Sequence, residues 1–131
     1  MGGNKRSIMD LKEKKAAGLV PDWMSGHGYK TLKSGYLLEG EEPVHMYERL
    51  AKASGIDEVY DYLWKGWLCP ASPVLSNFGT NRGLPISCYG STMVPDSVAG
   101  IMDSLKEVAM QTKAGGGTAV YMGDIRPRGS N

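Results

Sequence analysis

The clearest run of helically spaced apolar residues in the first half of the chain starts at residue 43, a proline. Proline suits the first turn of a helix, and the pattern predicts a helix over residues 43–54. Tyr47, Leu50 and Ala51 fall on one face of it, and Gly55 is the expected stop. This helix is therefore expected to turn one apolar stripe toward a core.

A second apolar stripe follows immediately. Asp57 is a predicted N-cap, and the side chains after it recur at helical spacing. The stripe consists of Val59, Tyr60, Leu63, Trp64 and Trp67. Core packing explains these aromatic residues better than a ligand site does, because a wide stripe is typical of a buried helix face. We expect two short antiparallel helices that pack on a larger body.

The strongest helix prediction covers residues 98–113. Asp96 and Ser97 stand where an N-cap is expected, and Gly115 stands just after the last turn. The apolar stripe between them consists of Val98, Ile101, Met102, Leu105, Val108 and Ala109. An apolar run at residues 118–122 then predicts a short strand that is buried on both faces. Since no later strand follows it, we expect this strand to belong to a larger α/β sheet or barrel.

The remaining segments carry weaker signals. Residues 4–17 predict a short charged helix that ends at Gly18. Residues 21–38 contain several glycines and predict a loop, with a brief strand at residues 35–38. Prolines and glycines interrupt residues 70–85, which also predicts a loop.

Composition narrows the class of protein. A chain of 131 residues with 41% hydrophobic residues is typical of one small folded domain. The formal net charge of +1 argues against a general electrostatic nucleic-acid binder, and no apolar run reaches the length of a membrane span. The charged N-terminus lacks the apolar core of a secretory signal. Two cysteines make neither a disulfide scaffold nor a metal knuckle, so a cytoplasmic protein with reduced thiols is the simplest inference.

Short hydroxyl side chains gather around the proline- and glycine-rich stretch. These donors, suited to phosphate or sugar oxygens, are Ser72, Ser76, Thr80 and Ser87. An ordinary surface loop is the alternative explanation, and composition alone favours it. The run Gly115–Gly117 offers a backbone without side chains, which lets a flat ligand approach closely. A helix cap followed by a flexible turn explains the same glycines equally well.

Thiols and guanidinium groups complete the candidate chemistry. A lone cysteine such as Cys88 is more often a small buried apolar residue than a catalyst, and packing is also expected for Cys69. Arg126 and Arg128 have the side chains to hold phosphates bidentately, and a solvated pair is the alternative. The residue types alone leave these alternatives open.

The order of the motifs resembles the large, catalytic subunit of ribonucleotide reductase. The similar segments are PASPVLSNFGTNRGLPISCYG, VPDSVAGI, KAGGG and DIRPRGS, all within residues 68–131. Upstream, VPDW, GYLL and MYERLAK are similar to the helical part that precedes the barrel in some members. The resemblance implies an N-terminal helical segment at residues 1–67 and the first part of the reductase barrel at residues 68–131. The expected fold class is therefore α/β, the incomplete start of a ten-stranded α/β barrel preceded by a small helical segment.

The resemblance also implies the chemistry. In this family a thiyl radical on one cysteine removes the 3′ hydrogen of a ribonucleotide, water leaves C2′, and a cysteine pair supplies the reducing electrons. Cys88 matches one cysteine of that reducing pair. Ser72 and Ser87 match positions that hold the phosphate and ribose of the substrate. Ala114 and Gly115 match backbone that lies along the substrate.

An allosteric site is implied in the same way. Asp96 and Ser97 match a helix start that contacts an effector deoxynucleotide, and Arg126 matches an arginine that binds its phosphates. Residues 116–126 match the first specificity loop, which lies between the active site and the effector site. Because glycines let such a loop approach both ligands, the two sites can be coupled energetically.

Cofactors and partners follow from the family reaction. No metal ligand and no bound cofactor are expected in this segment; the radical would come from a metal-cofactor small subunit or from adenosylcobalamin. Deoxynucleoside triphosphates or ATP would be the effectors. The expected partners are the rest of the catalytic subunit, the radical-generating small subunit, a second complete subunit and a thioredoxin-type reductant, with neither nucleic acid nor membrane. The expected location is the cytoplasm, or the host cytoplasm for a phage-encoded chain.

In the family, the radical-bearing cysteine, the second reducing cysteine and the catalytic glutamate lie in later segments. We therefore expect no turnover from this polypeptide alone, whether it is one piece of a split subunit, a truncated product or a fragment. Two alternatives remain: a non-enzymatic nucleotide-binding or dimerisation module, and a decayed fragment without a function of its own.

Overall fold

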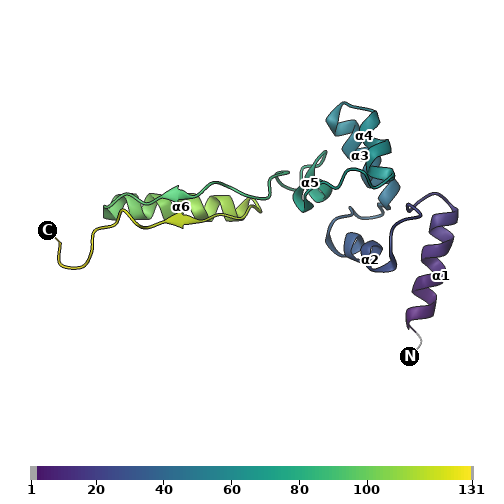
Figure 1. Ribbon diagram of the computed structural model, residues 1–131, viewed down its shortest axis with the longest axis horizontal. Helices are drawn as coiled ribbons and strands as arrows, with labels where there is room; N and C mark the ends of the chain where they lie inside the picture. Colours follow the sequence, from purple (N-terminus) through teal and green to yellow (C-terminus); the bar gives the residue numbers. More distant parts are fainter. Residues whose placement is uncertain (1–2, 131) are drawn as a thin grey trace. The chain divides into compact units, whose positions relative to one another are not determined.

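The computed structural model describes residues 3–130, which form two compact units divided between Pro85 and Ile86. The first unit contains only helices: α1 (Gly3–Ala16), α2 (Gly26–Gly35), α3 (Pro43–Ser54), α4 (Glu58–Trp64) and α5 (Ser72–Asn77). The second contains β1 (Thr92–Met93), α6 (Val98–Lys113) and β2 (Val120–Tyr121), as Figure 1 shows. The described fold is thus mostly helical with little sheet, and the barrel stays a prediction.

Helices α3 and α4 confirm the two helices expected from the apolar stripes. The α3 helix begins with a capping box, in which the backbone N–H of Glu42 donates to His45 Nδ1 over 3.1 Å. It ends at Gly55, whose φ of 71° is the left-handed conformation that glycine adopts without strain. Asp57 occupies the N-cap of α4, but its side chain makes no capping hydrogen bond.

The core of the first unit lies where α2, α3 and α4 meet. Its buried residues are Val20, Met24, Tyr29, Met46, Tyr47, Leu50 and Leu63. The predicted stripe on α4 is confirmed for Leu63, with Val59, Tyr60 and Trp64 packed beside it. The prediction is wrong for Trp67, which is 72% exposed. Gly66, with a φ of 73°, ends the helix, so the chain turns and carries Trp67 away from the stripe.

The loop predicted for residues 21–38 is wrong in its middle part, where residues 26–35 form helix α2. Ser25 caps this helix, because its hydroxyl accepts a 3.0 Å hydrogen bond from the Gly28 backbone N–H. Tyr29 is buried and Leu32 packs against the core, so tertiary packing stabilises a segment whose glycines disfavour a helix. The brief strand predicted at residues 35–38 is absent from this described segment.

A hydrogen-bonded network joins α1, α2 and α3. Lys14 Nζ donates to Tyr29 Oη over 2.7 Å and also to Glu42 Oε1, while Tyr29 Oη donates to Glu42 Oε2 over 2.8 Å. The hydrogen bond to Glu42 raises the pKa of Lys14. Partial burial by itself raises the pKa of Glu42, but the hydrogen bonds from Lys14 and Tyr29 outweigh it and leave that pKa below its usual value. The network therefore stays charged at neutral pH.

The loop predicted for residues 70–85 contains a short helix, α5, which α3 holds in place. Arg49 Nη2 donates to Leu75 O over 2.9 Å, and Arg49 Nη1 donates to Phe78 O. These bonds reach the C-terminal carbonyls of α5, which have no partner within the helix. The compact units consequently divide after α5, whereas the family resemblance sets the domain boundary before it, at residues 67 and 68.

In the second unit, the helix predicted at residues 98–113 is confirmed. Ser97 is the N-cap, and its hydroxyl accepts a 3.0 Å hydrogen bond from the Gly100 backbone N–H. Gly115 follows the last turn with a φ of 90°, as a C′ glycine does. Strands β1 and β2 pair in parallel, with Thr92 opposite Val120 and Met93 opposite Tyr121.

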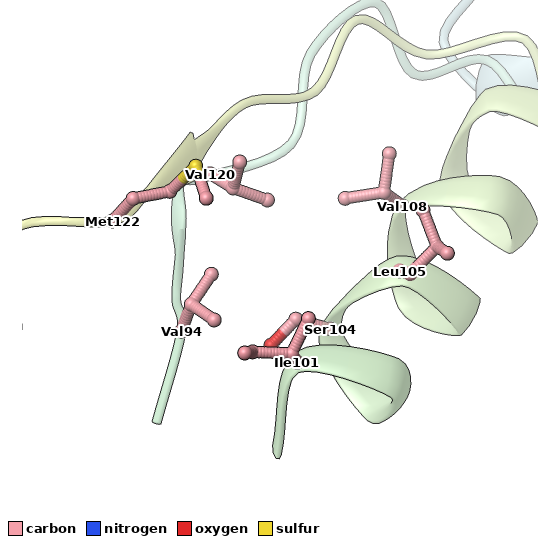
Figure 2. A pocket seen from close by; sticks show the side chains of 7 residues that line it. All are labelled: Val94, Ile101, Ser104, Leu105, Val108, Val120 and Met122. Atoms are coloured by element: carbon pink, nitrogen blue, oxygen red, sulfur yellow. The ribbon is translucent and has the colours of Figure 1, made fainter. Parts of the chain in front are cut away.

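The predicted burial of the second strand and of the α6 stripe is wrong for the described chain. Val120, Tyr121 and Met122 are 41%, 52% and 59% exposed, and Leu105 on α6 is 62% exposed. Part of the reason is a cavity of about 260 Å³ between helix and strands. Figure 2 shows Val94, Val120 and Met122 on the strand side, facing Ile101, Leu105 and Val108 on α6. The apolar faces are aligned as the pattern predicts, but they are not closely packed.

Two glycines with the same backbone conformation give a matched test of packing between α3 and the loop after α5. Gly55 and Gly79 have φ values of 71° and 75°. A Cβ at Gly79 would lie 3.0 Å from Ala53 Cβ, whereas a Cβ at Gly55 would meet nothing within 4 Å. We expect Gly55→Ala to cost about 1–2 kcal/mol of unfolding free energy, from left-handed strain alone. Gly79→Ala should cost about 1–3 kcal/mol more, from overpacking.

Urea unfolding of both variants measures the difference. Equal losses in the two variants would contradict the close approach of the loop to α3.

No helix within residues 3–130 is both long enough and apolar enough to cross a membrane.

Candidate thiol and anion sites

Cys88 lies beside the glycine turn that follows α6. The backbone of Cys88 forms an isolated parallel bridge with Gly117. The Gly117 N–H donates to Ser87 O over 2.8 Å, and the Tyr89 N–H donates to Gly117 O over 2.8 Å. Two segments that are far apart in the sequence thereby lie side by side, and the backbone of Cys88 lies between the two hydrogen bonds.

Each glycine of the triplet has a separate structural reason. Gly115 adopts the left-handed conformation that ends α6. Gly116 is buried against the ring of Tyr89, where a Cβ would lie 2.2 Å from the Tyr89 Cε2 atom. Gly117 makes the bridge to Cys88. The helix-cap interpretation is therefore confirmed for Gly115, whereas the approach of a flat ligand to this backbone stays a prediction.

The thiol is accessible. Cys88 is a free, exposed cysteine, so the expectation from the residue type alone, a small buried apolar residue, is wrong for it. Ser87 is also exposed, and the Ala114 N–H continues the helix by donating to Met110 O over 3.0 Å. Cys69 is likewise free and exposed, so the packing role expected for it is wrong.

The predicted effector residues meet at the start of α6. Arg126 Nε lies 2.9 Å from Asp96 Oδ2, in an ion pair whose side chains are 50% and 35% exposed. An exposed pair of this kind stabilises the fold by at most about 1 kcal/mol. The ion pair holds the Arg126 guanidinium beside the start of α6. Ser97 lies next to the pair and caps α6.

Ser72 belongs to the first unit, at the first residue of α5. Its hydroxyl lies 3.2 Å from Tyr36 Oη, and its carbonyl accepts a 3.1 Å hydrogen bond from Ser76 Oγ. Ser72 is exposed. Of the candidate residues, the structure thus brings Cys88 and Ser87 to the glycine turn and joins Asp96 to Arg126, while Ser72 contacts a tyrosine that the sequence pattern did not single out.

Tyr36 and Arg49 are the residues that the sequence reasoning missed. Tyr36 is 36 positions from Ser72, and Arg49 is 26 positions from Leu75, so neither contact follows a helix or strand period. Within residues 3–130, no group of three or more His, Cys, Asp or Glu side chains could hold a metal ion.

A family match and two related sequences support the resemblance to the large subunit of ribonucleotide reductase. The family described as "Ribonucleotide reductase, all-alpha domain" matches residues 24–83, a stretch that includes α2 to α5. The ribonucleoside-diphosphate reductase large subunit of Vaccinia virus is 40% identical over 114 residues, which cover 79% of this chain and 15% of the viral protein. The corresponding protein of Danio rerio is 38% identical over 113 residues, with 78% and 14% covered.

A solved structure is similar as well. The alpha subunit of the Actinobacillus ureae class Id ribonucleotide reductase matches with a TM-score of 0.70 and 44% sequence identity. The match covers 83% of this chain and 22% of that subunit. The matched part of the chain therefore spans about a seventh of the length of these large subunits, 15% of the viral protein and 14% of the fish protein.

Proposed function

Because the chain is related to the large subunit of ribonucleotide reductase over an N-terminal portion of that subunit, we propose that it works as part of a ribonucleotide reductase. The observation that carries the proposal is the exposed Cys88 thiol, fixed by backbone bridging beside the glycine turn. A reducing thiol has to be accessible to a substrate, to a second thiol and to an external reductant, and a buried thiol would not be.

The proposed role of Cys88 is to supply half of the reducing equivalents. A ribonucleotide becomes a deoxyribonucleotide and water by taking up two electrons and two protons. Two thiols provide both when they are oxidised to one disulfide, so Cys88 requires a partner cysteine from the rest of the catalytic subunit. A thiyl radical on a further cysteine of that subunit removes the 3′ hydrogen and later returns it. The thioredoxin-type reductant then restores the two thiols.

The substrate contacts belong to the same proposal. The names of the similar subunits specify ribonucleoside diphosphates, and we propose this substrate class for the chain. Ser87 and Ser72 would bind ribose and phosphate oxygens through their hydroxyls, and the backbone of Ala114 and Gly115 would lie along the nucleotide. Both serines are exposed, which supports this role.

The remaining components would come from outside this chain. The rest of the catalytic subunit would complete the barrel, and a metal-cofactor small subunit, or adenosylcobalamin, would supply the radical. On this proposal the chain alone has no turnover.

The test is reconstitution: the chain is mixed with the remainder of the catalytic subunit, the radical source, a ribonucleoside diphosphate and reduced thioredoxin. Deoxynucleotide that forms only when the chain is present is the expected result. A verified assembly that makes no product would contradict the proposal.

A second candidate function is non-enzymatic nucleotide binding, and the Asp96–Arg126 pair favours it. The pair holds the Arg126 guanidinium at the start of α6, and a guanidinium suits the oxygens of a triphosphate. We predict that Arg126→Gln weakens deoxynucleoside triphosphate binding to the reconstituted assembly by about ten- to a hundredfold, through loss of a charged hydrogen bond of about 1.5–3 kcal/mol.

Arg128→Gln is the matched control, since Arg128 is an exposed arginine two positions away. Equilibrium dialysis with labelled nucleotide measures both variants. Equal affinities in the two variants would remove Arg126 from the effector site. Tight, Arg126-dependent binding by the chain without any partner would favour the non-enzymatic module.

A further inference from the structure

We infer that Tyr36 is a positioning residue for substrate binding, which acts by directing the hydroxyl of Ser72. The inference deepens the proposed function and rests on it, because it takes Ser72 as a substrate contact. It starts from one contact: Tyr36 Oη and Ser72 Oγ lie 3.2 Å apart, and either atom has the geometry to donate. The two residues come from α2 and α5, and both belong to the first compact unit.

Both partners of this contact have anchored backbones. Tyr36 is the C-cap of α2, and its N–H donates to Leu32 O over 2.9 Å. On the other side, Arg49 donates to the carbonyls of Leu75 and Phe78 and so fixes the α5 end of the segment. Arg49 is itself oriented by Glu41, with Nε 2.9 Å from Glu41 Oε1. The backbones on both sides of the contact are therefore held by hydrogen bonds within the first unit.

A second hydrogen bond ties the same two segments together. Arg82, in the loop after α5, donates through Nη2 to Gly35 O over 3.3 Å, one residue before Tyr36. The C-terminal end of α2 is thus connected to the α5 segment on both sides of that short helix. Two separate hydrogen bonds therefore join the end of α2 to the segment that carries Ser72.

The chemistry of the two hydroxyls sets the direction of the hydrogen bond when an anion is present. Each hydroxyl has one proton to donate and lone pairs with which to accept. A phosphate oxygen accepts only, so Ser72 has to donate its proton outward to bind one. Tyr36 then becomes the donor to Ser72 Oγ, and the phenol suits this role because it is more acidic than an alkyl hydroxyl. Donation by Tyr36 also polarises the serine hydroxyl and strengthens its outward bond.

The expected effect falls on substrate affinity. Tyr36→Phe keeps the ring and removes only the hydroxyl, so the assembly should still form. In the reconstituted reductase we expect KM for the ribonucleoside diphosphate to rise about fivefold, the effect of losing one neutral hydrogen bond. The value of kcat should change little, because Tyr36 does not touch the reacting atoms. Tyr62→Phe, at an exposed tyrosine on α4, is the matched control and should leave KM unchanged.

A double-mutant cycle separates positioning from a structural role. If Tyr36 acts through Ser72, Tyr36→Phe should add nothing to the KM of Ser72→Ala. The urea midpoint of Tyr36→Phe should stay close to that of the unchanged chain. Additive increases in KM would overturn the inference, since Tyr36 would then act elsewhere.

Failure of the inference and failure of the proposed function give different results. If Ser72→Ala raises KM and Tyr36→Phe does not, the inference is overturned while the substrate role of Ser72 stands. If neither variant changes KM, both Ser72 and Tyr36 are removed from the substrate site. An assembly in which the unchanged chain yields no product contradicts the proposed function, and the inference fails with it.

Discussion

Replacing Cys88 by serine is expected to reduce turnover of the reconstituted reductase to background. Serine has nearly the same size and the position is exposed, so the fold and the backbone bridge to Gly117 should persist. A hydroxyl cannot be oxidised to a disulfide, and the two electrons that replace the 2′-hydroxyl then have no source in the pair. The loss should therefore appear in kcat, whereas binding of the nucleotide should be retained.

Cys69→Ser is the matched control. Cys69 is the other cysteine of the sequence, and it is also free and exposed. The family resemblance gives it no function, so this variant should keep full turnover. Deoxynucleotide formation is measured under excess reduced thioredoxin, and binding of nucleotide is measured separately by equilibrium dialysis. Turnover that survives Cys88→Ser, or that is lost equally in Cys69→Ser, would contradict the assignment.

The second large effect is expected for stability, at the ion pair that holds α5. Arg49 and Glu41 have side chains that are only 11% and 8% exposed, with Arg49 Nε 2.9 Å from Glu41 Oε1. Arg49→Met removes one partner and leaves a nearly buried carboxylate without its counter-charge. It also takes away the donors to Leu75 O and Phe78 O. We expect unfolding free energy to fall by about 3–5 kcal/mol, a large part of the stability of a small domain.

Lys52→Met tests whether this loss comes from the buried pair or from any change of charge on α3. Lys52 lies on the same helix and is exposed, so its replacement should change the unfolding free energy by no more than about 0.5 kcal/mol. Urea unfolding of the chain, followed by circular dichroism, measures both variants. Similar small losses in the two variants would show that the interactions of Arg49 contribute little.

Local chemistry explains which parts of the fold were predictable. Helices α3 and α6 have both a start signal and a stop signal, namely Pro43 with Gly55 and Ser97 with Gly115, and the structure has both helices where the sequence predicts them. Helix α2 was missed because its glycines disfavour a helix. Packing of Tyr29 and Leu32 against the core outweighs that cost.

Non-local contacts explain what the sequence could not supply. The pairing of Cys88 with Gly117 and the hydrogen bond between Tyr36 and Ser72 join residues with no periodic relation. The burial predicted for the apolar stripe of α6 is wrong for a different reason. An apolar stripe reveals which face of α6 can be buried, but not whether another element covers it, and Leu105 stays 62% exposed in the described chain.

The most direct test of the central claim, that Cys88 is a reducing thiol, is its oxidation state after a single turnover. The reconstituted assembly is supplied with a ribonucleoside diphosphate but no thioredoxin, then alkylated, digested and examined by mass spectrometry. We predict that Cys88 disappears from the alkylated fraction in proportion to the deoxynucleotide formed and is recovered in a disulfide, while Cys69 stays fully alkylated. Deoxynucleotide formed while Cys88 remains a free thiol would contradict the claim.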